Sequence, residues 1–250
     1  MNNAKLIVLE GLDGSGKSTQ IEIIKEYFKE KNLTYAYVHF PIYGHNEASS
    51  VIAAYLRGEY GDINKVDPIF VANMYAMDRF LYLPELKKQI LENDVVLLDR
   101  YVFSNMAYQG AKHNNVSQSK IMRDWINEFE FGFLELPYPD INIFFDVPIE
   151  TIEKRLLEKR DGNDREYLNG KSDIHEADIE FQRRVRDNYF VLDNYSNFKI
   201  VQCGKLEVTP ESKEGNIIIY SPEEIFKVYE EKLNEILYYK IKNKIIEKHV

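Results

Sequence analysis

The chain has 250 residues, of which 44% are hydrophobic and 29% are charged, a size and composition typical of one globular α/β domain. Its formal net charge is −9, which argues against a nucleic-acid partner or an anionic membrane surface, because both attract basic proteins. The single cysteine, Cys203, excludes an intrachain disulfide, and with no signal-like or membrane-spanning apolar run we expect a cytoplasmic protein.

Short runs rich in apolar residues alternate with helical patterns along the chain. This alternation predicts an α/β fold in which a parallel sheet of about five strands is flanked by helices. The strand-like runs are continuously apolar, as expected when helices cover both faces of a sheet. We expect the strands at residues 6–9, 35–39, 95–98, 141–145 and 199–202.

Two helices are indicated in the first half of the chain. Residues 17–31 carry apolar side chains at helical spacing. Asp67 and Pro68 have the character of an N-cap and a first helical residue, which predicts a helix to about residue 83. Pro84 is then expected to kink the helix or to restart it.

The second half of the chain contains two polar stretches and a final helix. Residues 159–178 are rich in charged residues, Asn and Gly, which fits either a solvated loop or a mobile lid. Residues 207–216 resemble an exposed excursion, and residues 222–248 have the pattern of a long C-terminal helix. Because neither stretch marks a domain boundary, we expect residues 1–250 to form a single domain.

A phosphate-binding loop lies between the first strand and the first helix. Its glycines let backbone N–H groups face phosphate oxygens, and the helix N-terminus adds positive potential. Lys17 is expected to reach the β- and γ-phosphates, and the Ser18 hydroxyl to bind Mg²⁺. The segment matches G-x-x-x-x-G-K-[ST], with Thr19 following it: Gly11-Leu12-Asp13-Gly14-Ser15-Gly16-Lys17-Ser18.

Asp99 and Arg100 follow directly on the strand predicted at 95–98. An aspartate at this end of a strand beside a P-loop is placed to hold Mg²⁺, directly or through water. The planar guanidinium of Arg100 suits a phosphate group. A strand-end salt bridge is the alternative interpretation of this pair.

The chain resembles the thymidylate kinases among the P-loop nucleoside monophosphate kinases, from Leu6 to about Tyr189. The resemblance implies the fold of that group with a lid, transfer of the γ-phosphoryl group of ATP to dTMP with Mg²⁺, and a homodimer. Helices near 69–83 and 121–133 carry enough apolar surface for such a dimer. The motifs that carry the resemblance are Glu10 to Thr19, Phe40-Pro41, Tyr75-Ala76-Met77-Asp78-Arg79, and Asp99 to Gly110.

The resemblance also implies a set of dTMP-binding residues. Tyr75 occupies the position that stacks on thymine, and Arg79, one helical turn later, the position that hydrogen-bonds the base. Tyr108 would pack where a ribose 2′-hydroxyl projects, and so exclude ribonucleotides. The structural alternative makes Tyr75 a core aromatic residue and Arg79 a surface ion-pair partner, with Tyr108 packing in the helix core and Asn105 capping a helix start. The full set is Tyr43, Tyr75, Arg79, Arg100, Asn105, Tyr108, His175 and Glu176, with Asp13 near the acceptor ribose and the metal.

Two positions depart from the family pattern. Ile42 stands where many members have an arginine that contacts the acceptor phosphate, so Arg100 or another cation must replace it. In the P-loop, Gly14 has no side chain to supply a transition-state charge. That charge is therefore expected from the lid, where Arg155, Arg160, Arg165 and Lys171 are available and Arg160 and Arg165 are our choices.

The catalytic set predicted in this way is Lys17, Arg100, Arg160, Arg165 and Asp13, with Ser18, Asp99 and Asp13 as metal ligands. No histidine-centred set is needed, because the acceptor phosphate is already ionised at neutral pH. Two alternatives stay open. The chain could phosphorylate another nucleoside monophosphate or a deoxynucleoside, or it could be a nucleotide-dependent switch without turnover.

Overall fold

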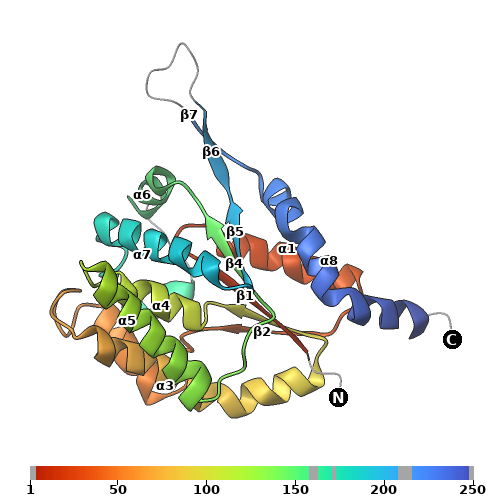
Figure 1. Cartoon of the computed structure of the whole chain (residues 1–250), viewed down its shortest axis with the longest axis horizontal. Coiled ribbons are helices and arrows are strands. Elements are labelled where there is room, and N and C mark those ends of the chain that lie inside the picture. The colour runs from red at the N-terminus through yellow and green to blue at the C-terminus, as the bar shows by residue number, and fades with distance from the viewer. Residues whose placement is uncertain (1–3, 158–162, 171–172, 208–215, 248–250) are drawn as a thin grey trace.

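The fold is built on a five-stranded parallel sheet with the strand order β2-β3-β1-β4-β5 (Figure 1). The computed structural model describes residues 4–157, 163–170, 173–207 and 216–247. The strands are β1 (Lys5–Gly11), β2 (Tyr35–His39), β3 (Val95–Asp99), β4 (Ile141–Asp146) and β5 (Phe198–Gln202). The predicted fold class is therefore confirmed, and each predicted strand lies within one or two residues of its expected bounds.

Helices cover both faces of the sheet. α1 (Lys17–Glu30) and α8 (Pro222–Glu247) pack together on one face, and α4 (Val102–Gly110), α5 (Val116–Asn127) and α7 (Ile179–Val191) pack together on the other (Figure 1). α2 (Glu47–Leu56) packs on α3 (Pro68–Glu92), and α6 (Ile149–Leu157) follows β4. Every residue of β3 and β4 is buried, which explains their continuously apolar sequences.

Short helical turns complete the structure. A π-helix, η1 (Glu128–Phe133), continues α5, and two 3₁₀ turns, η2 (Asn163–Leu168) and η3 (Leu192–Asn194), flank α7 in the chain. The expected lid at 159–178 lies partly outside the described residues, because 158–162 and 171–172 are not described. Within the described part of the chain, no helix is long and apolar enough to cross a membrane.

The structure differs from the sequence prediction at two places. α3 does not end at residue 83 but continues through Pro84 to Glu92 as one helix. On either side of the polar stretch predicted at 207–216, the structure adds two strands that the sequence did not predict, β6 (Gly204–Glu207) and β7 (Asn216–Ile219), which pair antiparallel and project from the body beyond β5 (Figure 1). Residues 208–215 lie outside the described residues.

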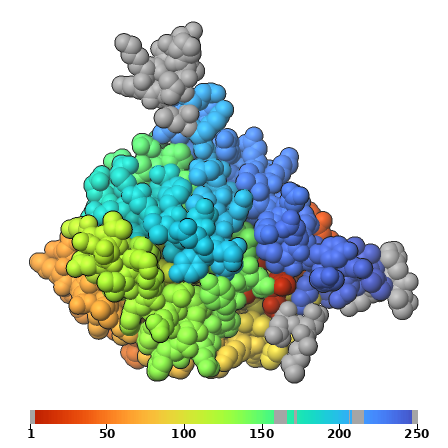
Figure 2. Space-filling view, in the orientation of Figure 1, coloured from red at the N-terminus to blue at the C-terminus, as the bar shows by residue number. Residues whose placement is uncertain are grey.

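The C-terminal helix α8 is part of the folded body. The Tyr229 hydroxyl donates to Gln20 Oε1 at 2.6 Å, and the Tyr27 hydroxyl donates to Asn234 Oδ1 at 2.8 Å, so α8 is joined to α1 by buried and half-buried hydrogen bonds. Figure 2 shows α8, in blue, covering one side of the molecule, with its last described turns extending past the body. Packing against the helix that follows the P-loop is thus one function of this segment.

Candidate active site

The P-loop has the backbone conformation that phosphate binding requires. It connects β1 to α1, and Gly14 (φ 81°) and Gly16 (φ 87°) both lie in the left-handed region that favours glycine. A Cβ atom added at Gly11 would lie 2.5 Å from Ser15 Oγ, so the loop also needs a glycine where it leaves the strand. The motif predicted from sequence therefore adopts the expected strand-loop-helix arrangement.

Lys17 is the buried cation of this loop. Its Nζ donates to the carbonyl oxygens of Gly11 at 3.1 Å and Leu12 at 3.2 Å, which folds the side chain back over the loop. Burial, together with the nearby charge of Arg100, lowers the pKa of Lys17 to about 8. Added negative charge from a phosphate would raise that pKa again, so phosphate binding favours the charged lysine.

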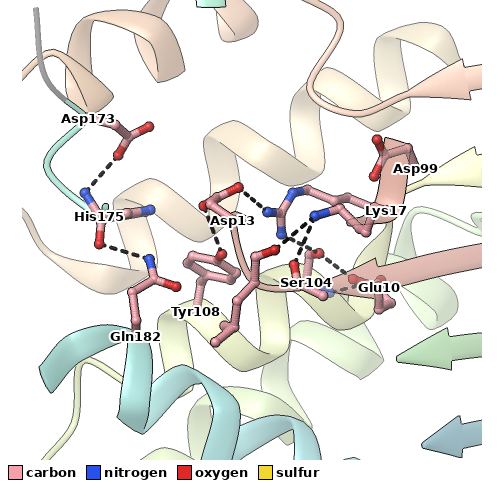
Figure 3. A network of polar contacts seen from close by, with 12 residues as sticks. Glu10, Asp13, Lys17, Asp99, Ser104, Tyr108, Asp173, His175 and Gln182 are labelled. Atoms are coloured by element: carbon pink, nitrogen blue, oxygen red, sulfur yellow. Dashed lines mark hydrogen bonds and ion pairs between the residues drawn. The ribbon is translucent and has the colours of Figure 1, made fainter. Parts of the chain in front are cut away.

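Asp13 links the P-loop to the strand-end arginine. Arg100 Nη2 donates to Asp13 Oδ1 at 2.6 Å, and the Tyr108 hydroxyl donates to Asp13 Oδ2 at 3.3 Å (Figure 3). Arg100 has a φ of 66°, which is unusual for a residue other than glycine and costs roughly 1 kcal/mol. This conformation, directly after β3, turns the guanidinium toward the P-loop instead of along the sheet.

Glu10 fixes the start of α4, which carries two of the predicted acceptor residues. The Glu10 carboxylate is fully buried and accepts hydrogen bonds from the backbone N–H groups of Tyr101 and Ser104 at 3.1 and 3.2 Å. It also accepts from the Ser104 hydroxyl (Figure 3) and from the Tyr189 hydroxyl, the latter at 2.9 Å. Burial raises the pKa of Glu10, although these hydrogen bonds oppose the rise. α4 is thereby capped from β1 and held at a fixed position relative to the P-loop.

Asp99 and Ser18 have the chemistry of a magnesium site. Mg²⁺ prefers oxygen ligands, and in phosphoryl-transfer sites it uses one or two protein groups, water and substrate phosphates. Asp99 Oδ2 is 3.1 Å from His39 Nδ1, whereas Asp99 Oδ1 is buried and has no hydrogen-bond partner among the described residues. Burial would raise the pKa of Asp99, but the hydrogen bond from His39 and the charge of Lys17 lower it overall. Ser18 is exposed in the first turn of α1. Both groups thus fit the ion.

The predicted acceptor residues all line one cavity beside the P-loop. The cavity has a volume of about 820 Å³ including its open mouth, and Asp13 forms part of its wall. Five further lining residues carry polar groups that the sequence reasoning did not select, namely His39, Ser104, Gln109, Tyr167 and Asp173. The eight predicted residues that line it are Tyr43, Tyr75, Arg79, Arg100, Asn105, Tyr108, His175 and Glu176.

Aromatic rings form part of the cavity wall. Tyr43 and Tyr167 stack with their centroids 4.1 Å apart and their planes 9° from parallel, which joins the loop after β2 to the segment after α6. Tyr75 lines the cavity from α3 and is half-buried. Tyr108, from α4, lies 5.3 Å from the guanidinium carbon of Arg100. Planar rings in these positions suit a flat heterocyclic base.

Arg79 and Asn105 meet at a buried carboxylate. Arg79 donates to both oxygens of Glu130, at 2.6 Å from Nε and 2.7 Å from Nη2. Asn105 Nδ2 donates to Glu130 Oε1 at 2.8 Å. Burial would lower the pKa of Arg79, but the charge and hydrogen bonds of Glu130 raise it overall. Arg79 is thus an ion-pair partner, as one interpretation of the sequence held, but the pair is buried and not on the surface.

Asp173 and His175, which lie within the segment predicted as a lid, form part of the cavity wall. Asp173 Oδ1 accepts from the backbone N–H of His175 at 2.7 Å (Figure 3), and Asp173 Oδ2 accepts from the Tyr167 hydroxyl at 3.1 Å. Burial, with repulsion from Asp13, raises the pKa of Asp173 to about 7. Burial, with repulsion from Lys112, holds the pKa of His175 well below its usual range. Both groups are therefore largely uncharged in mildly acidic solution.

The described cation nearest the P-loop from the lid side is Arg155. Its Nη1 donates to the carbonyl oxygen of Gly14 at 2.6 Å, and its side chain lies in van der Waals contact with the position where a Gly14 Cβ would be. Arg160 and Lys171 lie outside the described residues, and of Arg165 only the backbone, in η2, is described. Among the described residues, the arginine that reaches Gly14 is therefore not one of the two chosen from sequence.

At the position of the missing arginine, the chain is held by a hydrogen bond to Asp78. The Ile42 backbone N–H donates to Asp78 Oδ2 at 3.0 Å, and Asn46 Nδ2 donates to Asp78 Oδ1 at 2.8 Å. The Ile42 side chain packs against the core. The cavity wall also contains the imidazole of His39, at the end of β2. Ile42 itself supplies no charge to the cavity, in which Arg100 is a lining cation.

Comparisons with known proteins agree on one family. The family model described as thymidylate kinase matches residues 9–208. A thymidylate kinase of Mycobacterium tuberculosis is 33% identical over 180 residues, which cover 72% of this chain and 81% of that protein. A probable thymidylate kinase of Saccharolobus solfataricus is 31% identical over 202 residues, covering 80% and 89%. The solved structure of a thymidylate kinase from Candida albicans has a TM-score of 0.64 at 19% identity and covers 93% of both chains.

Proposed function

The chain belongs to the thymidylate kinase family, and from that premise we propose that it transfers the γ-phosphoryl group of ATP to dTMP, giving dTDP and ADP. The observation that supports this best is that one cavity contains Asp13 of the P-loop in its wall and is lined by all eight expected acceptor residues. A nucleoside monophosphate bound there would have its phosphate close to Asp13 and Arg100 of the phosphate-transfer region.

The test is a coupled assay of ADP release with a panel of nucleoside monophosphates. We expect dTMP to be preferred, with dUMP as the next-best acceptor. ADP release that is equal for all acceptors, or fastest with a purine monophosphate, would contradict the proposal. ATP binding without ADP release with any acceptor would instead identify a nucleotide switch.

In this mechanism the residues of the chain position phosphates and neutralise charge. The backbone N–H groups of the P-loop and Lys17 hold the β- and γ-phosphates of ATP. Arg100 holds the acceptor phosphate, and its contact with Asp13 keeps the guanidinium at the junction of the two substrates. The acceptor oxygen is already ionised at neutral pH, so no residue has to remove a proton from it.

We assign the charge at the transferring phosphoryl group to Arg155. Its hydrogen bond to the Gly14 carbonyl places the guanidinium beside the glycine that has no side chain of its own. Arg160 and Arg165 remain proposals as further lid cations. Because developing negative charge on the transferring group is stabilised by a nearby guanidinium, removing Arg155 should reduce kcat more than it weakens ATP binding.

Mg²⁺ would be held by Asp99 and Ser18, together with the phosphates of ATP. When bound, the ion neutralises charge that develops on the β- and γ-oxygens. Asp13 was also expected to be a ligand, but both of its carboxylate oxygens already accept hydrogen bonds from Arg100 and Tyr108. We therefore assign Asp13 to the acceptor side of the site, where it orients Arg100.

Quaternary structure and location follow from the family only as proposals. We propose that the chain acts as a single-domain cytoplasmic enzyme and as a homodimer that uses α3. This helix has a row of exposed apolar side chains, and exposed rows of this kind mark interfaces. Phe80→Glu should convert a dimer to a monomer in analytical ultracentrifugation, whereas Glu85→Gln on the same helix should not. The exposed residues of the row are Ile69, Phe70, Met77, Phe80 and Leu81.

A further inference from the structure

Glu130 is a completely buried carboxylate that does not line the cavity but contacts two residues that do. Arg79 and Asn105 are exposed by only 2% and 3%, and Glu130 by 0%. Glu130 lies in η1, the π-helix that continues α5, and the Phe131 ring packs 4.5 Å from Tyr138 and 6.2 Å from Tyr101. The position of the carboxylate is therefore set by the packing of its own helical turn.

The contacts of Glu130 determine which atoms of Arg79 are available to a ligand. Two of the three guanidinium nitrogens, Nε and Nη2, are used by the two carboxylate oxygens in a bidentate pair. In the described part of the chain, the third nitrogen, Nη1, makes no hydrogen bond. Because Arg79 lines the cavity, what it can offer a bound base is a hydrogen-bond donor.

The same carboxylate determines the orientation of the Asn105 amide. Two acceptors converge on Asn105 Nδ2, namely Glu130 Oε1 at 2.8 Å and the Ala72 carbonyl oxygen at 3.0 Å. The flipped amide would direct its oxygen at both acceptors, so only one orientation is compatible with the network. Asn105 Oδ1 is then a buried acceptor without a partner among the described residues. Such an atom is costly unless a ligand pairs with it.

Both residues line the cavity, so Arg79 has one donor and Asn105 one acceptor left for a ligand bound there. Thymine and uracil have the complementary pattern, with an O4 acceptor beside an N3–H donor. Cytosine has the reverse, an amino donor beside an N3 acceptor, and would meet each group of the wall with a group of the same kind. A mismatch of this sort leaves buried polar groups unpaired, which is how sites reject a close analogue.

We propose that Glu130 is a positioning residue that fixes the donor–acceptor order of the base site and thereby selects thymine and uracil over cytosine. This inference rests on the proposed function, because it concerns the acceptor base of the same reaction. The two are separable: the function fails if the unmodified enzyme does not phosphorylate dTMP. The inference fails if that enzyme is active but its choice of base does not depend on Glu130.

The experiment compares Glu130→Gln with Glu128→Gln, a matched control two residues earlier in the same π-helix, where the side chain is exposed. The Glu130 carboxylate accepts from three donors, two on Arg79 and one on Asn105. The side-chain amide of a glutamine has only one oxygen to accept, so at least one of these donors would face its NH₂ group. The terminal amide of Asn105 can relieve this by rotating, which would turn its Nδ2 toward the base.

The measured quantities are kcat and KM for dTMP and the inhibition constant of dCMP against dTMP. For Glu130→Gln we expect the preference for dTMP over dCMP to fall by about tenfold or more, mainly through KM for dTMP. Glu128→Gln should leave the preference unchanged. A Glu130→Gln enzyme that folds and keeps the wild-type preference within about threefold would overturn the proposal, because a purely structural ion pair would alter stability without altering base choice.

Two further measurements cover the case in which Glu130→Gln does not fold. Glu130→Asp keeps the charge but shortens the side chain by one carbon, so it should fold and lose part of the preference. In the unmodified protein, both side-chain amide protons of Asn105 should exchange slowly with solvent by NMR without an acceptor present. Rapid exchange of both protons, or unchanged preference in Glu130→Asp, would also overturn the proposal.

Discussion

Asp173 provides a quantitative test of the electrostatics of the cavity. Burial and repulsion from Asp13 raise its pKa from 3.8 to about 7, so the fold disfavours the charged carboxylate. Below pH 3.8 the side chain is protonated in both the folded and the unfolded chain, and no cost arises. Between pH 3.8 and 7 the unfolded chain ionises first, and above pH 7 the full cost is present. A folded pKa of about 7 corresponds to a cost of roughly 4 kcal/mol at pH 8.

Asp173→Asn should remove this cost and keep the hydrogen bonds. The asparagine Oδ1 can accept from the His175 N–H, and its Nδ2 can donate to the Tyr167 hydroxyl oxygen, as a protonated carboxyl group would. We therefore expect the gain in unfolding free energy to rise from about 1 kcal/mol at pH 4.5 to at most about 4 kcal/mol at pH 8.

Urea denaturation of dilute samples, followed by the fluorescence of the single tryptophan, Trp125, measures this difference. Asp193→Asn, at an exposed position in η3, is the control and should show no comparable pH-dependent gain. A gain from Asp173→Asn that is the same at both pH values, or a loss at pH 8, would refute the assignment of Asp173 as a carboxylate destabilised by burial.

Three other outcomes are expected. Arg155→Met should lower kcat by roughly 10²–10³-fold, whereas Lys154→Met, at an exposed position on the same helix, should change it little; equal effects would argue against a role for Arg155 in transfer. Tyr108→Ala should raise kcat/KM for UMP relative to dUMP by about tenfold, whereas Tyr108→Phe should keep the wild-type ratio; an unchanged ratio in Tyr108→Ala would remove the tyrosine from the sugar-selecting wall. Burial lowers the pKa of Lys112 from 10.5 to about 7, so its charged form costs folding free energy below pH 7 and this cost declines as the pH rises. Lys112→Met should therefore stabilise the protein by at most about 5 kcal/mol at pH 6 and about 2 kcal/mol at pH 9, and calorimetry that shows a larger gain at pH 9 would contradict the sign.

The elements that could be predicted from the sequence are those whose residues determine them locally, by their apolar pattern or by a motif. The central strands β1, β3 and β4 are buried almost throughout, so their sequences are mainly apolar, and the P-loop has a spacing that no ordinary turn requires. The end of α3 was not predictable in this way. A proline inside a helix costs about 3 kcal/mol, which favours an ending before Pro84. The helix continues because Leu83 and Leu86, on either side of the proline, are both buried in the core.

The residues of the candidate site also fall into two groups, those that the sequence predicts and those that only the structure shows. The eight predicted acceptor residues came from the family resemblance, five of them from its motifs, and each lines the cavity. Glu130 could not be found from sequence, because it is 51 residues from Arg79 and no spacing rule joins them. Glu128 and Glu130 look alike in the chain, and only the π-helix decides which of the two is buried. Asp173 lies only two residues before the predicted site residue His175. Its raised pKa depends on burial, which the polar sequence around it does not predict.

The arrangement of cations around the P-loop explains how a chain with a net charge of −9 can bind two anionic phosphate-containing substrates. In the described part of the chain, three cations contact the loop, and each has an acceptor there. Lys17 contacts the carbonyl oxygens of Gly11 and Leu12, Arg100 contacts Asp13, and Arg155 contacts the carbonyl oxygen of Gly14. Folding therefore does not have to bury these charges unpaired, which would cost several kcal/mol for each ion. When a phosphate oxygen replaces one of these acceptors, the cation loses a contact with a carbonyl oxygen or with Asp13. It gains a stronger, charge-assisted hydrogen bond to the phosphate. The affinity for phosphate then depends on this local exchange, and the overall charge of the protein has little influence on it, because charges beyond about 10 Å are largely screened.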